Sequence, residues 1–477
     1  MKAAKKFFCV VLFLSVIFIS CVKSGSAPQI PTTIIQVQQL DSNGNPIDQK
    51  TINYEIGFEP IIEFFGAAYP VHILSMASIN ALPDGTSRMS NTDDYIGDIF
   101  GDFGAAIYIK GSSNETIPLK LEIEASRFIN KSSIEIKIQQ DKEIEVFPRI
   151  AYDYHALERL IQPANENVNF RLYSNSVQIM EKMEVVRFHS INEVPFAARN
   201  RKDPEQFVDL TWLFSAYVNE DDPSIDKILH EALQIGTADK IGFGNEFSFS
   251  GYGNQENTGL SVDLQALAIW SVFLSNKIKY SNITTTSNVT SSNDNKKVWS
   301  QYVRTLGESF GNAQANCVDG SVLFASVLRK IGINPMLILI PGHMFLGYVR
   351  DPELWELLRQ VIFEEDGEDA DYDWFNDEEA VGIFTAAFGF LETTMLGNVD
   401  LSKYTSDESF LGKAKRLLGF GTTQSKVTLE SFLAAQEVGE MQFAESIGNF
   451  FDDENPDYRI IDISHWRVFG IRPVTRY

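Results

Sequence analysis

The stretch NCVDGSVLFASVLRKIGINPMLILIPGH, residues 316–343, decides how the second half of this chain folds. Residues 317–331 have the apolar spacing of one helix, and Gly332 ends it. Residues 335–340 form an apolar run that is typical of a buried strand, and Pro341-Gly342 predicts a turn after it. The pattern therefore predicts a helix followed by a strand that returns along it.

The lengths of these two elements indicate which residues meet. The helix carries the chain about 20 Å, at about 1.5 Å per residue, and the strand covers a similar distance at about 3.3 Å per residue. If the strand runs antiparallel to the helix, the chain comes back to the point where the helix began. His343 is therefore expected beside Cys317, which is the only cysteine after Cys21.

A cysteine beside a histidine suggests a nucleophile with its base. A free thiol has a pKa near about 8.5, so attack on an amide or ester carbonyl requires a neighbour that stabilises the thiolate. A helix N-terminus favours negative charge, and an imidazole can take the thiol proton and return it to the leaving amine. The backbone N–H of Cys317 is expected to be one oxyanion donor. The alternative is a buried, inert cysteine.

Other residues near the cysteine, and the other histidines, are assigned structural roles. Asp319 suits the first turn of a helix, where a carboxylate caps unpaired N–H groups. Gln314 and Trp299 lie upstream, and neither has a setting that identifies it as the second oxyanion donor. The remaining histidines are interpreted as surface or packing residues: His72, His155, His189, His230 and His465.

The third group is expected on a later strand. Residues 343–349 read as a strand that leaves the site, so Asp351 would lie about 25 Å away and is a poor partner for His343. A further apolar run, residues 384–396, is expected to return antiparallel to that strand. It carries Glu392 between apolar residues and two threonines, an unfavourable place for an ionisable side chain without a partner. We expect Glu392 to orient His343.

Taken together, several segments resemble the transglutaminase-like cysteine enzyme superfamily. They are Cys317-Val318-Asp319-Gly320-Ser321, the helix end Leu328-Arg329-Lys330-Ile331-Gly332-Ile333, the turn Pro341-Gly342-His343 and Leu391-Glu392-Thr393-Thr394. The resemblance covers residues 263–394 well and residues 216–477 more weakly. It implies a papain-like α+β core, with Cys317 as nucleophile, His343 as base and Glu392 as the third member of a triad.

The chain departs from the pattern of that superfamily around the base. Glu392 stands where Asp is usual, and residues 344–347 replace the aromatic and acidic residues that often follow the histidine. A long acidic insertion, residues 351–385, also separates His343 from Glu392. These departures leave the assignments of the cysteine and the histidine standing and leave the substrate open.

The acidic insertion could hold a metal ion or could simply be solvated. Asp369, Asp371 and Asp373 alternate as Ca²⁺ ligands do, but the stretch lacks an ordered loop pattern with a terminal Glu. A solvated flap beside the cleft is the favoured interpretation, and no metal or other cofactor is expected. Over the mouth of the cleft, such a flap would disfavour anionic substrates and attract basic ones.

The amino end predicts export. Residues 1–20 begin with lysines before an apolar run that is too short to span a membrane comfortably, which is the layout of a secretory leader. Ser20-Cys21 resembles the lipobox of bacterial lipoproteins, and this resemblance implies that Cys21 is lipidated. The chain is then expected in the bacterial cell envelope, tethered to a membrane by its lipid and facing the periplasm or the cell surface. A plain cleaved leader or an uncleaved anchor is the alternative.

The spacing of apolar residues divides the rest of the chain. Residues 21–32 read as a linker and residues 33–215 as an antiparallel β-sandwich. Runs such as 118–124 and 133–138 alternate apolar and polar residues, which is typical of strands with one wet face. Residues 216–477 bring in helical spacing and are predicted to form the transglutaminase-like domain. The expected fold class is therefore α+β.

Composition agrees with an exported globular protein. The chain has 477 residues, of which 44% are hydrophobic, so it is long enough for roughly two or three domains. Its formal net charge is −24 and no basic patch stands out, so nucleic acid is not expected as a partner. Only Cys21 and Cys317 would survive maturation, so stability must come from packing instead of disulfides.

These observations support two functions of different kinds. The first is amide acyl transfer through a thioester on Cys317, ending by default in hydrolysis of a peptide or protein amide, because water is abundant and no amine site is visible. The second is a catalytically inactive domain kept as a binding or envelope-structural module. The reactivity of the thiol distinguishes them.

Overall fold

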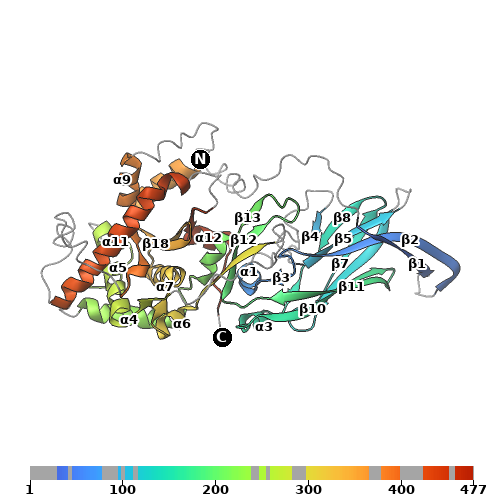
Figure 1. The fold of residues 1–477 in the computed structure, drawn as a ribbon, viewed down its shortest axis with the longest axis horizontal. Helices are drawn as coiled ribbons and strands as arrows, with labels where there is room; N and C mark the ends of the chain where they lie inside the picture. Colours follow the sequence, from blue (N-terminus) through green and yellow to red (C-terminus); the bar gives the residue numbers. More distant parts are fainter. Residues whose placement is uncertain are drawn as a thin grey trace, which may run out of the picture.

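The structure is a computed structural model that describes residues 30–40, 46–77, 95–97, 103–110, 116–237, 247–253, 258–281, 297–364, 378–397, 423–450 and 457–475. Helices and strands occur together with several sheets, which confirms the α+β class. Figure 1 shows an elongated molecule with strands gathered at one end and most helices at the other. We call these parts the β lobe (described part of residues 30–188) and the mixed lobe (described part of residues 189–475).

Two sheets build the β lobe around one core. The first has the order β1-β2-β5-β8-β4 and the second has the order β3-β11-β10-β6-β7-β9. Side chains from both sheets, including Phe58, Ile107, Leu121 and Phe170, meet in one buried cluster. The alternating runs of the sequence lie in β6 and β7, where every second residue points into this cluster.

The elements of the β lobe have these bounds. The first sheet comprises β1 (Thr32–Leu40), β2 (Pro46–Ile62), β4 (Tyr95–Gly97), β5 (Phe103–Lys110) and β8 (Glu143–Phe147). The second sheet comprises β3 (Ala67–Ala68), β6 (Thr116–Ala125), β7 (Ile129–Gln139), β9 (Ala151–Tyr152), β10 (Ala164–Ser174) and β11 (Val177–Phe188). Two short helices, which the sequence pattern did not predict, are α1 (Pro70–Ser75) and α3 (Tyr154–Glu158).

The mixed lobe alternates helices with short strands. Its first half contains β12 (Glu193–Arg199), β13 (Phe207–Asp209), η1 (Thr211–Tyr217), α4 (Pro223–Thr237), α5 (Thr258–Ser275), β14 (Lys279–Tyr280), β15 (Val298–Tyr302), α6 (Leu306–Gly311), β16 (Gln314–Ala315) and α7 (Cys317–Lys330). Its second half contains β17 (Pro335–Ile340), β18 (His343–Val349), α8 (Pro352–Glu364), α9 (Glu378–Ala387), β19 (Phe388–Leu391), η3 (Thr393–Met395), α11 (Thr423–Phe450), β20 (Arg459–Asp462) and α12 (Ile463–Phe469). Among the helices of the described residues, none is long and apolar enough to cross a membrane.

A four-stranded sheet with the order β19-β18-β17-β20 carries the site and is covered on both faces. On one face, Leu337 and Leu346 join the core that contains the buried side chains of α7. On the other face, Ile338 and Phe345 join a second core that contains Phe443 of α11. A sheet buried on both faces explains why its strands read as continuous apolar runs in the sequence. All three strand pairs are antiparallel.

A few residues of the β lobe join the core of the mixed lobe. Tyr69 and Val71 of the β lobe belong to the same buried cluster as the side chains of α5 and α7. The C-terminal segment joins the lobes as well, because the backbone N–H of Arg472 donates to the carbonyl oxygen of Ser75 at 3.0 Å. The C-terminal segment therefore lies close to α1, and η1 of the mixed lobe also contacts α1.

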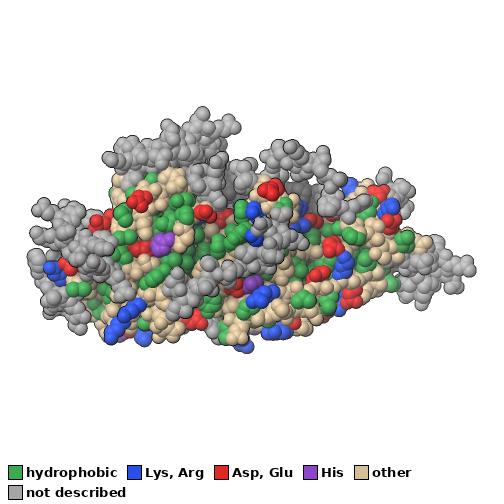
Figure 2. Space-filling model, viewed as in Figure 1, with side chains coloured by type: hydrophobic (Ala, Val, Ile, Leu, Met, Phe, Trp, Pro, Cys, Tyr) green, Lys and Arg blue, Asp and Glu red, His purple; other side chains and the backbone are tan. Residues whose placement is uncertain are grey.

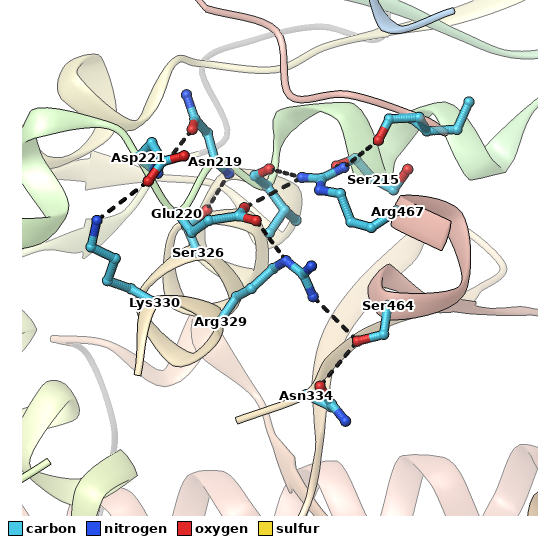
Figure 3. Close-up of polar contacts among 12 residues, drawn as sticks. Ser215, Asn219, Glu220, Asp221, Ser326, Arg329, Lys330, Asn334, Ser464 and Arg467 are labelled. Carbon is cyan, nitrogen blue, oxygen red and sulfur yellow. Dashed lines mark hydrogen bonds and ion pairs between the residues drawn. The ribbon is translucent and has the colours of Figure 1, made fainter. Parts of the chain in front are cut away.

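A polar network holds the C-terminal end of α7 (Figure 3). Arg329 Nε donates to Glu220 Oε1 at 2.7 Å, and Arg329 Nη1 donates to Ser464 Oγ at 3.2 Å. Ser326 Oγ accepts the backbone N–H of Asn219 at 2.9 Å. These partners come from the loop before α4 and from α12, so segments that are distant in sequence fix the orientation of this helix.

The chain before β19 differs from the sequence prediction. Residues 384–387, expected at the start of a strand, form the last turn of α9, and the strand is confined to Phe388–Leu391. Ala386-Ala387 favour a helix, and the Phe384 ring packs 5.6 Å from the Phe443 ring of α11. Packing against α11 therefore favours a helix at residues 384–387, although their apolar run is also typical of a strand.

The described flanks of the acidic insertion are helical, whereas residues 365–377, which include most of the predicted flap's acidic run, lie outside the described residues. Leu358 of α8 is buried in the core on the outer face of the sheet. Asp351 begins this helix, and its Oδ1 accepts the backbone N–H of Glu353 at 3.0 Å. Asp369, Asp371 and Asp373, considered above as Ca²⁺ ligands, lie outside the described residues, as do the predicted leader and Cys21.

Candidate active site

Cys317 is the first residue of α7, and a capping box builds this helix start. Asn316 Oδ1 accepts the backbone N–H of Asp319 at 2.8 Å, and Asp319 Oδ2 accepts the backbone N–H of Asn316 at 3.1 Å. The prediction that Asp319 caps the helix is confirmed. Cys317 is a free cysteine of intermediate exposure that packs partly against the core of the mixed lobe.

His343 opens β18 directly after the predicted turn. β17 and β18 pair antiparallel with Ile340 opposite His343, and Gly342 takes a φ of +73° in the turn. Glycine adopts that left-handed conformation without a Cβ penalty. β18 packs against α7, and His343 lies close enough to Cys317 for that residue to help raise the pKa of the imidazole. The helix and the strand thus return the histidine to the cysteine, as their lengths predicted.

The third strand brings in Glu392. β19 pairs antiparallel with β18, with Leu391 opposite Leu346, and Glu392 follows directly. His343 Nε2–H donates to Glu392 Oε2 at 2.6 Å, which leaves Nδ1 for the thiol. Glu392 Oε1 accepts the backbone N–H and the hydroxyl group of Thr394, at 2.9 and 2.6 Å. Glu392 is 2% exposed, and these hydrogen bonds satisfy its buried carboxylate.

Burial and hydrogen bonding act in opposite directions on the histidine and the glutamate. Burial disfavours charge on His343, but its hydrogen bonds to Cys317 and Glu392 and the charges of those groups raise the pKa of His343 to about 10. Burial alone would raise the pKa of Glu392, whereas hydrogen bonds from His343 and Thr394 hold this pKa below its usual value. A raised pKa makes the imidazole of His343 a stronger base.

Tyr280 also lies at the site, although no sequence pattern singles it out. β14 and β16 pair in parallel and place Tyr280 opposite Ala315, just before the cysteine. β14 also contacts η3, the turn that follows Glu392. Burial raises the pKa of Tyr280, and the nearby charges of Cys317 and Glu392 raise it further. Tyr280 is 41% exposed, and the effect of Cys317 and Glu392 on its pKa places the phenol in their neighbourhood.

The other residues considered from the sequence have different surroundings. The Trp299 ring packs 5.3 Å from the Phe207 ring and beneath the guanidinium of Arg199, whereas Gln314 is an exposed residue of β16. His189 is buried and its Nδ1 bonds Glu193 Oε2 at 2.7 Å, a buried pair that the sequence did not indicate. We find no role for these groups in the chemistry at Cys317.

The described part of the chain has no group of side chains suited to a metal ion, and the face in Figure 2 has no basic patch. Within those ranges, no three His, Cys, Asp or Glu side chains gather so that they could hold a metal ion. On the face shown in Figure 2, Lys and Arg side chains are scattered among acidic ones instead of gathering over one element. No protein-family model matches the chain, and no curated protein matches it.

Gly320 is the point where α7 meets the turn after Glu392. A Cβ at Gly320 would lie 2.8 Å from Thr393 Oγ1 and 3.0 Å from Thr393 Cβ. Because Thr393 is buried, Gly320→Ala is expected to displace η3 and to slow alkylation of Cys317 by about tenfold to a hundredfold. Gly311→Ala is the control, since nothing lies within 4 Å of the added Cβ. Equal alkylation rates in the two variants at neutral pH would contradict the prediction.

Proposed function

We propose that this chain is an exported transglutaminase-like cysteine enzyme that transfers acyl groups from amides through a thioester on Cys317. One observation carries the proposal: a partly exposed cysteine at a helix start lies beside His343, which buried Glu392 holds by a hydrogen bond. The order of helix, strand and strand that supplies these residues supports the resemblance stated above. A merely structural cysteine has no need of such a partner.

Each group has a step in the proposed reaction. His343 takes the thiol proton, and the Cys317 thiolate attacks the carbonyl carbon of an amide. The backbone N–H of Cys317 and the Tyr280 hydroxyl group donate to the oxyanion of the tetrahedral intermediate. The C–N bond breaks, and the amine leaves with the proton from His343. Water then attacks the thioester carbonyl, its proton passes to His343, and the acid departs as the thiolate is restored.

Glu392 acts by orienting the imidazole in this scheme. Its hydrogen bond to Nε2–H fixes the tautomer in which Nδ1 faces the thiol. The carboxylate also stabilises the imidazolium that forms when the thiol proton is transferred. Thr394 holds the other carboxylate oxygen, so the ring has one defined orientation.

The wider fold and the location are part of the same proposal. We propose a papain-like arrangement for the mixed lobe, because a helix bearing the cysteine packs on an antiparallel sheet bearing the other two groups. We propose a β-sandwich for the β lobe, because its two sheets share one core. The lysines and apolar run of residues 1–20 support export, with the mature chain tethered to a membrane of the bacterial cell envelope through lipidated Cys21.

The substrate class follows from the chemistry. A thioester enzyme without an amine site hydrolyses its intermediate by default, so a peptide or protein amide cleaved by water is the proposed substrate. Transfer to an amine is the variant outcome. Nucleic acid is not a proposed partner, since the formal net charge of the chain is −24.

The proposal is tested by alkylation of the folded, full-length chain with iodoacetamide at a series of pH values. Mass spectrometry of the peptide that contains Cys317 separates its labelling from that of the other cysteines. We expect rapid labelling of Cys317 near neutral pH, because His343 stabilises the thiolate. We expect His343→Ala to slow this labelling by about tenfold or more and His155→Ala, a change at an exposed histidine of α3, to leave it unchanged.

Labelling that requires denaturation would sink the enzyme proposal. It would instead support the rival function, in which the domain is a catalytically inactive binding or envelope-structural module. Labelling of the folded chain at the same rate with and without His343 would show an accessible thiol without a base. That result would also count against catalysis.

Tyr280→Phe tests the second oxyanion donor. Removing one such donor is expected to lower the turnover of 4-nitrophenyl acetate by about tenfold to a hundredfold and to leave alkylation of Cys317 nearly unchanged, because alkylation forms no oxyanion. Tyr154→Phe, at a tyrosine of α3 with similar exposure, is the control. A matching loss in both rates would mean that Tyr280 supports the fold of the site instead of donating to the substrate.

A further inference from the structure

A buried ion pair lies behind the first turn of α7. The Asp319 side chain is 0% exposed and the Arg304 side chain is 10% exposed, and Arg304 Nη1 donates to Asp319 Oδ2. Asp319 Oδ1 accepts the backbone N–H of Arg304 at 2.8 Å. One arginine therefore meets this carboxylate with both its side chain and its backbone.

The backbone around Arg304 is itself fixed. The backbone N–H of Val303 donates to the carbonyl oxygen of Asn192 at 2.7 Å, and Asn192 Nδ2 donates to the carbonyl oxygen of Val303 at 2.9 Å. On the other side, Thr305 caps α6 and its backbone N–H donates to Glu308 Oε2 at 3.0 Å. Asp319 therefore binds a backbone segment that hydrogen bonds hold in place on both sides of Arg304.

This pair controls the residue that precedes the thiol. Asp319 Oδ2 accepts the backbone N–H of Asn316, and the Asn316 side chain accepts the backbone N–H of Asp319. A capping box needs only the carboxylate, and burying an arginine beside it carries a desolvation cost. The arginine therefore calls for a reason beyond the cap.

Charge supplies that reason. A buried carboxylate in the first turn of α7 would oppose the formation of a thiolate at Cys317. The guanidinium of Arg304 offsets that charge. The other titratable groups around the thiol are Tyr280 from β14, His343 from β18 and Glu392 after β19, and none of them contacts Asp319 in the described residues.

We propose that Arg304 is a positioning residue of the active site, which neutralises Asp319 so that this carboxylate can hold Asn316 and Cys317 in place without opposing the thiolate. The inference rests on the proposed role of Cys317 as a nucleophile. Under this proposal the loop before α6, which carries Arg304, influences the reactivity of the Cys317 thiol.

Removal of the charge on Arg304 and removal of the charge on Asp319 are expected to shift the pH midpoint of Cys317 alkylation in opposite directions. Arg304→Gln leaves the carboxylate without its counter-charge, so the pH midpoint of Cys317 alkylation is expected to rise by about one unit, for charges roughly 10 Å or less apart at an effective dielectric constant of about 20. Asp319→Asn leaves the guanidinium alone and is expected to lower the midpoint by about the same amount. Arg304→Lys keeps the charge and is expected to restore the midpoint of the unsubstituted chain.

The experiment measures the rate of iodoacetamide labelling of Cys317 between pH 5 and pH 10 in the full-length chain, at about 0.1 M salt. Arg329→Gln is the matched control, because this arginine forms an ion pair at the other end of the same helix. Its loss is expected to lower the thermal midpoint of unfolding without moving the alkylation midpoint. A shift in this control of the size seen in Arg304→Gln would overturn the proposal.

A double variant keeps the test decisive if one neutral variant does not fold. Arg304→Gln with Asp319→Asn removes both charges and retains hydrogen-bonding amides, so its midpoint is expected to return to that of the unsubstituted chain. A midpoint in the double variant that departs by about a unit or more would overturn the proposal, as would shifts of the same sign in the two single variants. If Cys317 of the unsubstituted chain is unreactive in the folded state, the proposed function fails instead.

Discussion

Glu392→Gln is expected to lower the turnover of 4-nitrophenyl acetate by about a hundredfold or more while the chain stays folded. The amide oxygen of Gln can accept the bonds from Thr394, so the amide nitrogen would then face His343 Nε2. Two donors cannot bond each other, so the imidazole would take the tautomer with its proton on Nδ1. That proton faces the thiol, and the ring can no longer accept the proton of Cys317.

The control for this variant is Glu158→Gln. Glu158 forms the same type of pair with His155, at 3.2 Å, but that histidine is exposed in the β lobe. Its turnover is expected to equal that of the unsubstituted chain. Full activity in Glu392→Gln would remove Glu392 from the site and leave a cysteine and histidine pair as the working unit.

The same variant tests how His343 links stability to pH. The pKa of His343 is 6.5 as an ordinary value and about 10 in the folded chain. A raised pKa means that its contribution to stability is fully present below pH 6.5 and is lost as the pH rises through about 10. Between these pH values the free energy of unfolding of the unsubstituted chain is expected to fall by about 1–3 kcal/mol more than that of Glu392→Gln, because the pKa of His343 is raised less in the variant. Urea unfolding at both pH values measures the difference, and equal losses would contradict it.

Gly389→Ala is expected to destabilise the chain by about 3–5 kcal/mol. Gly389 lies opposite Tyr348 in the antiparallel pair of β18 and β19, and a Cβ there would lie 2.2 Å from Tyr348 Cζ. Tyr348 is fully buried, and its hydroxyl group donates to Asp263 Oδ1 at 2.7 Å and accepts from Gln436 Nε2 at 2.8 Å. The ring cannot move aside without breaking this buried network, which also includes Arg350.

The control is Gly382→Ala in α9. Nothing lies within 4 Å of a Cβ at Gly382, and alanine favours the interior of a helix, so a gain of about 0.5–1 kcal/mol is expected. Urea unfolding of both variants gives the comparison. A small or favourable effect at Gly389 would show that β18 and β19 can separate at this pair, and the register that places Glu392 would then need another explanation.

The parts of the site that the sequence could predict depend on element length and order. The juxtaposition of Cys317 and His343 follows from one helix and one strand of similar length joined by short turns. The position of Glu392 follows from the next apolar run, although α9 takes the first part of that run. Such reasoning works because an antiparallel element returns the chain to its starting point when its length matches that of the element before it.

The remaining parts depend on contacts that have no local signature. Tyr280 reaches the site through a two-residue parallel strand, and a pairing of that length leaves no pattern in a sequence. Arg304 and Asp319 are visible only as a charge in a loop and a helix cap until their burial is known. The buried pair of His189 and Glu193 was missed for the same reason, since burial of polar groups is a property of the assembled fold.

The pairing of β18 with β19 has a consequence for how this architecture tolerates change. The two strands carry His343 and Glu392 at one end, while Val349 and Phe388 face each other at the opposite end, where the polypeptide departs toward α8 and returns from α9. Changes of length between α8 and α9 can therefore leave the spacing of His343 and Glu392 unchanged.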